Sequence, residues 1–238
     1  MHCFMRPFDP LFIIEVLPEL MQYLWVTLTV VVGSVVFGTL LGFVLTALKL
    51  SHHRMYRMIG DGYTCVIRCT PSIILLFIVF YGLPKFCLEV FDYDINEFHK
   101  MFFVITTFTL LFAASISEVM RSAYLAIDKG QYEAAVSIGL SPFQALYRII
   151  LPQGAIVALP NFGNAFITLL KEGALAYTIG LIDLLGSGNL IIAHNYGSYA
   201  LEIYIALSVI YWGMAILFEK VFLGLEDRLS RYKKTRTA

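Results

Sequence analysis

The sequence predicts an all-α, polytopic membrane protein with five transmembrane helices. Of its 238 residues, 59% are hydrophobic and only 14% are charged, whereas soluble domains carry roughly 25% charged residues. The mean hydropathy of the chain is +0.77. Five stretches with little or no charge approach the ~20 residues that a helix needs to cross ~30 Å of hydrocarbon. A chain of this composition requires lipid as its solvent.

Composition also excludes two other classes of protein. The 17 basic residues are balanced by 17 acidic ones, so the chain has no overall positive field for binding nucleic acid. Its four cysteines, Cys3, Cys65, Cys69 and Cys87, are too few for a disulfide-stapled secreted module. In their apolar surroundings we expect them to be small, buried hydrophobic residues.

The five predicted spans alternate with more polar loops. They cover residues 23–48, 62–84, 101–124, 154–170 with an apolar continuation to 185, and 198–222. In the first span, Gly33, Gly38 and Gly42 interrupt a run of Val, Leu and Phe. Small residues let helices approach closely in lipid, so we expect this span to pack tightly against another.

The flanking segments complete the division of the chain. Residues 1–20 contain prolines and acidic side chains and lack a short cationic start, so we do not interpret them as a cleavable signal. They are expected to form an amphipathic interfacial segment at the membrane surface, with a disordered tail as the alternative. The membrane domain covers residues 21–222 and includes a polar loop at 125–153, and a basic tail covers 223–238.

The distribution of lysine and arginine predicts the orientation. Loops rich in these residues stay on the cytoplasmic side of a membrane. The loops after spans one and three and the C-terminal tail together hold twelve of the 17 basic residues, whereas the opposite side holds four. We therefore predict that the N-terminus lies outside, and that loop 125–153 and the C-terminus lie inside.

No motif predicts catalysis or metal binding by this chain. The run Gly-Ser-Gly at 186–188 lacks the third glycine of a dinucleotide fold and the lysine of a phosphate-binding loop. His52 and His53 are adjacent and point in different directions. Cys65 and Cys69 lie one helical turn apart, but no second pair of ligands accompanies them. We expect no catalytic residue, no metal site and no cofactor bound by this chain.

The loop at 125–153 contains two short helix signals with a joint between them. Good helix formers at 133–138 precede Gly139, which suits the left-handed residue that ends a helix. Ser141 can cap a second helix that has Pro142 at its first position and runs to about Ile150. The second helix is expected to present one apolar stripe of four residues, Phe143, Leu146, Tyr147 and Ile150. A short exposed helix of this kind is suited to a groove on a partner.

The same loop resembles a known family signature. Glu133-Ala134-Ala135, followed by Gly139 and by Leu151-Pro152 at fixed offsets, is similar to the EAA motif of bacterial ATP-binding-cassette importer permeases. The resemblance covers about residues 23–220. It implies the type I importer permease fold, a bacterial cytoplasmic membrane location and a coupling helix that docks on a separate ATPase. The residues that it assigns to ATPase coupling are Glu133, Ala134, Ala135, Gly139, Ser141, Pro142, Phe143, Leu146, Leu151 and Pro152.

Three further stretches are similar to permeases for polar amino acids, such as those for histidine, glutamine, arginine and cystine. Residues 68–71, Arg-Cys-Thr-Pro, resemble their Arg-Gly-Thr-Pro with Cys69 in place of the glycine. Residues 117–122 resemble their Glu-x-x-Arg-(Gly/Ser) at the end of span three. Residues 171–175 depart from their Lys-(Asp/Glu)-(Thr/Ser)-Ser-Leu, because both hydroxyl residues are absent here.

Ionisable residues inside the spans form a second candidate site. A charged side chain in the bilayer costs about 2–3 kcal/mol or more and normally faces a partner or the interior of the bundle. One interpretation is ion pairing, of Glu118 with Arg68 or Arg121, and likewise of Lys171 with its neighbour Glu172. The other is a substrate path, where Arg or Lys meets a carboxylate and Glu meets an ammonium group. The candidate path residues are Arg68, Thr70, Pro71, Glu118, Asn161, Asn164, Lys171 and Glu172.

Two of these candidates are neutral amides on the fourth span. Asn161 and Asn164 lie beside Pro160 and Gly163, which interrupt the span. The amides either contribute to the path or bond the backbone carbonyls that the proline frees.

The resemblance implies a translocation subunit, not an enzyme, in an importer that moves a polar amino acid by alternating access. ATP and Mg²⁺ would be used by a partner, a dimer of cytoplasmic ATP-binding-cassette ATPase subunits. The other implied partners are a second permease copy or a homologous permease, an extracytoplasmic amino-acid-binding protein and membrane lipid. One rival hypothesis is an ion- or proton-coupled carrier that acts without an ATPase, with Glu118 as the proton site. The other is a membrane scaffold that transports nothing.

Overall fold

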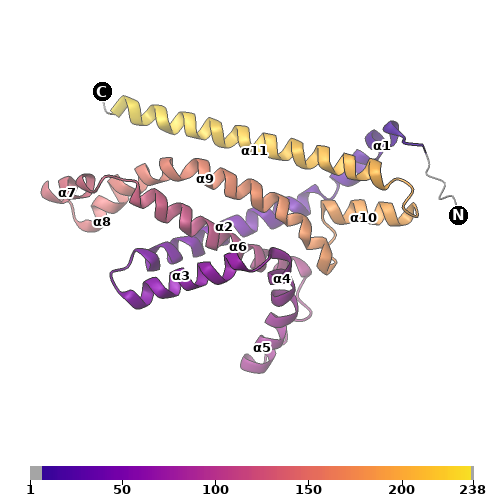
Figure 1. Ribbon diagram of the computed structural model, residues 1–238, viewed down its shortest axis with the longest axis horizontal. Helices are drawn as coiled ribbons and strands as arrows, with labels where there is room; N and C mark the ends of the chain where they lie inside the picture. Colours follow the sequence, from indigo (N-terminus) through magenta and orange to yellow (C-terminus); the bar gives the residue numbers. More distant parts are fainter. Residues whose placement is uncertain (1–6, 237–238) are drawn as a thin grey trace. The chain divides into compact units, whose positions relative to one another are not determined.

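The computed structural model describes residues 7–236, with side chains described through residue 229, so that Cys3 and the first residues of segment 1–20 lie outside the described part. The described residues form helices and no strand, which confirms the predicted all-α fold (Figure 1). Five of the described helical stretches are long and apolar enough to cross a membrane: Leu24–Leu50, Ser72–Phe91, Lys100–Leu125, Pro142–Ile179 and Ala200–Leu229.

The helices follow one another through short connections. In chain order they are α1 (Pro10–Met21), α2 (Leu24–Leu50), α3 (Arg54–Cys69), α4 (Ser72–Phe77), η1 (Ile78–Gly82), α5 (Leu83–Phe91), α6 (Lys100–Leu125), α7 (Lys129–Ser137), α8 (Pro142–Ala145), η2 (Leu146–Ile150), α9 (Leu151–Glu172), η3 (Gly173–Ile179), α10 (Leu184–His194) and α11 (Ala200–Arg236). The elements η1 and η2 are single π-helical turns, and η3 is a 3₁₀ segment.

The chain divides into two compact units. Among the described residues, the first comprises 7–34, 72–108 and 168–217, and the second comprises 35–71, 109–167 and 218–236. Buried residues of the first unit include Leu76, Phe103, Leu184 and Ile203. Buried residues of the second include Leu45, Phe112, Ile116 and Ala145. Because the divisions fall inside α2, α6, α9 and α11, each of these helices contributes to both units.

Helices α2 and α6 pack closely at the glycines of the first span, as predicted. A Cβ atom added at Gly38 would lie 3.0 Å from the Phe112 Cβ, and one added at Gly42 would overlap the side chain of Ile116. In the first unit, a Cβ at Gly33 would lie 3.2 Å from Ile105. The missing side chains therefore allow one backbone to approach the other.

The prediction for the second span is wrong at its start. The helix expected from residue 62 is broken at Thr70, whose extended φ of −93° and ψ of 126° end α3. Pro71 follows, and a proline disfavours helical geometry in the residue before it. The apolar stretch long enough to span begins instead at Ser72 and runs to Phe91. Helix α3 is a separate, more polar element.

Helix α1 gives the N-terminal segment an ordered structure in its described part. The Asp9 carboxylate caps the helix by accepting from the Leu11 N–H at 3.1 Å. The ring of Phe12 stacks on Tyr199 with centroids 3.8 Å apart. These contacts favour the helix over the disordered tail for Pro10–Met21, and its position at a membrane surface stays a prediction.

Candidate functional site

The first candidate site is the segment between α6 and α9, which begins with α7. Asp128 caps this helix by accepting from the Gly130 N–H. At its other end, the Leu140 N–H bonds to the Ala135 carbonyl at 3.2 Å. Gly139 has a φ of +92°, the left-handed conformation that was predicted for it. The joint is therefore encoded by local backbone geometry.

The second helix of this segment starts as the sequence predicts. The Ser141 hydroxyl accepts from the Gln144 N–H at 3.2 Å, and the Gln144 side-chain oxygen accepts from the Ser141 N–H at 2.9 Å. This reciprocal pair is a capping box. Pro142 occupies the first helical turn, where its missing N–H costs nothing.

The second helix was expected to end near Ile150, before Pro152, but it continues. It passes through the π-helical turn η2 directly into α9, and the Leu151 N–H bonds back to the Leu146 carbonyl. Proline inside a regular helix clashes with the carbonyl four residues earlier. The wider turn of η2 supplies an extra residue at this place, so Pro152 is accommodated without a break.

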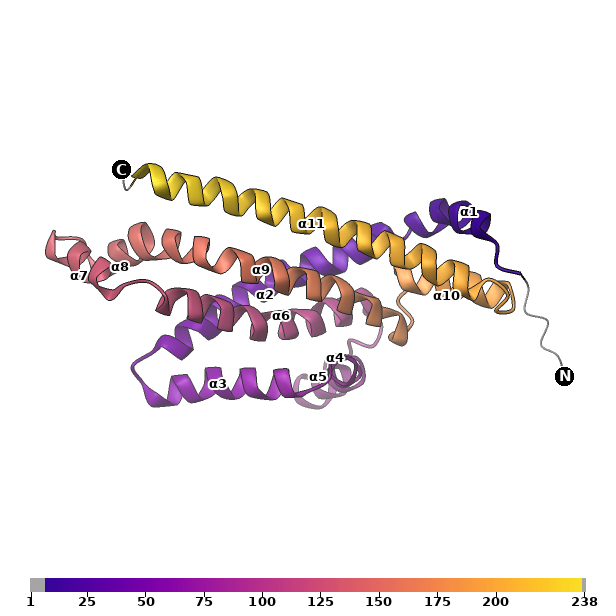
Figure 2. The same cartoon turned by 45° about the horizontal axis from the view of Figure 1, so that its top comes forward.

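The predicted apolar stripe is split between two faces. Phe143 and Tyr147 are 73% and 65% exposed, and their rings stack with an interplanar angle of 3° and centroids 6.3 Å apart. Leu146 is only half-buried and Ile150 is buried. The helix therefore has an exposed aromatic edge and an inner edge. Figures 1 and 2 both show α8 beside α7.

The other residues assigned to ATPase coupling divide in the same way. Ala135 is buried at 2% exposure, whereas Glu133 and Ala134 are exposed. Leu151 and Pro152 are also exposed, at the start of α9. The small side chain of Ala135 serves the packing of the segment, and Glu133 remains available to a partner.

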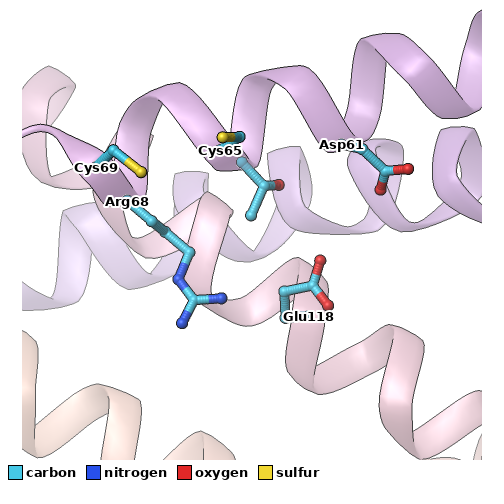
Figure 3. A pocket seen from close by; sticks show the side chains of 6 residues that line it. Asp61, Cys65, Arg68, Cys69 and Glu118 are labelled. Carbon is cyan, nitrogen blue, oxygen red and sulfur yellow. The ribbon is translucent and has the colours of Figure 1, made fainter.

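The second candidate site is a pocket of about 510 Å³ between α3 and α6 in the second unit. It is lined by Asp61, Thr64, Cys65, Arg68, Cys69 and Glu118 (Figure 3). Five of the six belong to α3, at spacings of three, four and seven residues that share one side of a helix. Glu118 comes from α6 and faces them.

Glu118 is held by two cations. Its Oε1 lies 2.6 Å from the Lys49 Nζ, and its Oε2 accepts from the Arg121 guanidinium at 2.8 and 3.0 Å. Lys49 also donates to the Ser117 hydroxyl at 2.8 Å and is fully buried as a side chain. The predicted pair with Arg121 forms, and Lys49, which the sequence placed in a loop, was missed as a partner.

Arg68 is left without an acidic partner. Within the described residues no carboxylate lies in ion-pair range of its guanidinium. Likewise, no lysine, arginine or histidine among them lies in ion-pair range of the Asp61 carboxylate. Figure 3 shows Arg68 extending from α3 toward the side of the pocket where Glu118 lies. The pocket thus contains one uncompensated positive and one uncompensated negative side chain. Asp61 was not among the sequence candidates, although it lies seven residues before Arg68 on the same helical face.

The remaining path candidates do not join this pocket. Thr70 donates its hydroxyl to the Val66 carbonyl at 2.8 Å, at the end of α3, and Pro71 follows it. Asn161 and Asn164 are exposed on α9 in the second unit. Of the candidates in that unit, only Arg68 and Glu118 line the pocket.

Lys171 and Glu172 belong to the first unit and do not form the expected pair. Glu172 accepts from the Ser72 hydroxyl at 3.1 Å, while Lys171 is exposed and has no ion pair within the described part of the chain. Consecutive residues on a helix point about 100° apart, which explains the outcome.

The cysteines also differ from expectation. Cys65 and Cys69 are exposed, and Cys87 is half-buried. Two of the three described cysteines therefore line the pocket and are not core residues.

Comparison with known proteins gives consistent results. The chain is 38% identical over 226 residues to the L-cystine transport system permease protein TcyL of Bacillus subtilis. The aligned region covers 95% of this chain and 93% of the relative. It is 34% identical over 213 residues to the arginine transport system permease protein ArtQ of the same organism, covering 90% and 93%. A crystal structure of an amino acid ABC transporter with histidines superposes with a TM-score of 0.80 at 29% identity, over 94% of this chain and 100% of that one.

Residues 34–231 match the family described as binding-protein-dependent transport system inner membrane component. The match covers more than half of the chain and contains both the segment 133–152 and the pocket residues of α3 and α6. With this match, and with five apolar helices of spanning length in the described part of the chain, the protein belongs to the family of inner membrane components of binding-protein-dependent transport systems.

Proposed function

We propose that this chain is the permease subunit of an ATP-driven importer of a polar amino acid. The observation that carries the proposal is the exposed, stacked pair Phe143 and Tyr147, which a capped helix start and a left-handed glycine hold in place. Two large rings exposed side by side on a short polar connection are suited to a groove on another protein. The relatives named as permeases for cystine and arginine support amino acids as the substrate class.

In this proposal the partner at Phe143 and Tyr147 is a cytoplasmic ATPase. Two ATPase subunits would bind and hydrolyse ATP with Mg²⁺, and would move two such segments, one from each of two paired permeases. A binding protein on the opposite side would deliver the amino acid. Each partner can shift the permease between inward- and outward-facing states only by binding one state more tightly than the other.

The pocket is the proposed substrate contact. An amino acid carries a carboxylate, and the pocket offers Arg68 to bind it. Asp61 lies seven residues before Arg68, about 10 Å along the helix, so it is suited to a second, positively charged group farther along the substrate. Glu118 adds negative charge, although Lys49 and Arg121 already hold its two oxygens. A guanidinium gives a carboxylate two parallel hydrogen bonds, which favours Arg68 as the anchor.

The coupling part of the proposal is tested with the double variant F143A/Y147A in the reconstituted transporter. The expected result is loss of ATP-driven uptake together with weaker co-purification of the ATPase, while the chain still inserts in the membrane. W212A is the matched control, because Trp212 is 68% exposed on a different helix and lies outside the segment. Normal ATP-driven uptake by the double variant contradicts the proposal, and uptake driven by a proton or sodium gradient without any ATPase supports the carrier instead.

The substrate part is tested with R68Q. We expect the concentration of amino acid that half-saturates uptake to rise about tenfold or more, since one charge-assisted hydrogen bond contributes roughly 1.5–3 kcal/mol. R57Q is the control, because Arg57 lies on the same helix, is exposed, and does not line the pocket. An unchanged half-saturating concentration in R68Q, with ATP coupling intact, removes the pocket from the path but leaves the coupling proposal standing.

A further inference from the structure

The pocket contains a feature that substrate transport does not explain. Cys65 and Cys69 lie one helical turn apart on α3, both are exposed, and both line the pocket. Figure 3 shows both side chains on the part of α3 that faces the viewer, with the Cys69 sulfur directed toward Cys65. Two exposed thiols one helical turn apart form a candidate bidentate ligand.

A direct bond between these sulfurs does not suit the helix. Residues four apart in an α-helix keep their Cβ atoms about 5–6 Å apart, whereas a disulfide needs Cβ atoms about 3.5–4.5 Å apart. An atom placed between the sulfurs adds two bonds of roughly 2.3 Å each, taking zinc–sulfur bonds as a guide. The spacing therefore favours a bridging ion over a disulfide.

The number of ligands restricts the kind of ion. Among the described residues, no three His, Cys, Asp or Glu side chains gather as a metal-binding group. Structural zinc requires four ligands, which these two thiolates do not supply. Thiolates select soft ions such as Cu(I). Two thiolates around a monovalent ion leave one net negative charge, which the unpaired guanidinium of Arg68 in the same pocket offsets.

We propose that Cys65 and Cys69 form a two-thiolate site for one soft, two-coordinate cation of the Cu(I) class. On binding, each thiol loses its proton to solvent, two metal–sulfur bonds form, and no electron is transferred. The site is defined by binding and does not rest on the transport function proposed above. A bound ion would lie beside Arg68 and occupy part of the pocket.

The experiment titrates the purified full-length chain in detergent with Cu(I) under anaerobic conditions, against a competing chromogenic Cu(I) chelator. We expect one Cu(I) per chain, and binding about 100-fold or more weaker in C65S and in C69S, because the second ligand then no longer acts at high effective concentration. The variant C3S/C87S should bind as the unchanged chain does.

A register control separates bidentate binding from a simple count of thiols. The double variant C69S/V66C keeps two exposed cysteines on α3, since Val66 is 64% exposed, but makes them adjacent and differently directed. It should bind as weakly as C69S. Tight binding that survives in C65S, C69S or C69S/V66C, or that is lost in C3S/C87S, overturns the proposal.

Discussion

The ammonium group of Lys49, on α2, lies 2.6 Å from the carboxylate of Glu118, on α6, although the Lys49 side chain is fully buried. Arg121 holds the other carboxylate oxygen one turn along α6. Removing one partner of a buried pair leaves the other charge without compensation, which costs more than the pair itself contributes. Separating α2 from α6 would leave the Lys49 charge without its partner, so this contact stabilises the packing of the two helices.

The first prediction follows from this pair. E118Q should lower the unfolding free energy of the purified protein by about 2 kcal/mol or more, because Lys49 remains buried and charged. In thermal unfolding this corresponds to a midpoint lowered by roughly 4–8 °C for a chain of this size. R121Q should cost less, because the Arg121 side chain is 37% exposed.

The double variant K49M/E118Q is the check on the cause. Replacing both partners removes the stranded charge, so its unfolding midpoint should lie above that of E118Q. The effects of K49M and E118Q on the unfolding free energy should therefore not add up in the double variant. If the double variant loses the sum of the two single effects, the two residues do not interact.

The second prediction concerns the close approach of α2 and α6. G42A should destabilise the protein by about 1–3 kcal/mol, since the added methyl group overlaps Ile116 and packed interiors resist added volume. G62A is the matched control, because nothing lies within 4 Å of a Cβ at that helical position. Its midpoint should stay the same or rise, as alanine favours a helix over glycine. Equal effects of the two substitutions would contradict the packing argument.

The third prediction concerns the joint between α7 and α8. At a φ of +92°, G139A places a side chain in a strained backbone conformation that costs about 1–2 kcal/mol. Nothing lies within 4 Å of a Cβ there, so the effect comes from the backbone alone. We expect a small change in thermal stability but a clear loss of ATP-driven uptake, because the segment 139–150 is reoriented. G154A, on α9 beyond the joint, should leave uptake unchanged, and a G139A protein that transports normally would exclude a need for this geometry.

The fourth prediction concerns Asp183, in the connection between η3 and α10. Its Oδ1 accepts from the Gly186 N–H at 2.8 Å, while its Oδ2 is buried without a hydrogen-bond partner among the described residues. Burial raises the pKa of this carboxyl from 3.8 to about 6. The folded state then binds the proton more tightly than the unfolded state does, so this group's contribution to stability is present below pH 3.8 and is lost as the pH rises through about 6.

The check compares the thermal midpoints of the unchanged protein and D183N between pH 4 and pH 7. Asparagine keeps the capping oxygen and cannot ionise, so D183N should gain about 2–3 kcal/mol relative to the unchanged protein over this range. A constant difference between D183N and the unchanged protein across the range would show that Asp183 does not titrate there.

The fold class and the joint could be read from the sequence because both depend on local properties. Spans follow from the length of apolar runs, and the Gly139, Ser141 and Pro142 pattern acts through the conformation of a few neighbouring residues. The break at Thr70 is also local, and the proline at 71 was a sufficient signal for it. The second span was nevertheless predicted to start at residue 62, because that prediction followed the length of the apolar run and not the position of the proline.

Other features depend on which helix lies against which. Lys49 and Glu118 are 69 residues apart, and only the packing of α2 on α6 makes them partners. Tertiary packing also decides which side of the second helix is exposed. Phe143 and Tyr147 are exposed, whereas Ile150 is buried and Leu146 half-buried, on a helix that contacts α7. The sequence by itself determined an all-helical membrane chain with a jointed polar segment, because these follow from hydropathy and backbone preference. The tertiary structure alone decided which charges are paired, which thiols are exposed and where the pocket lies, because each of these is a relation between side chains distant along the chain.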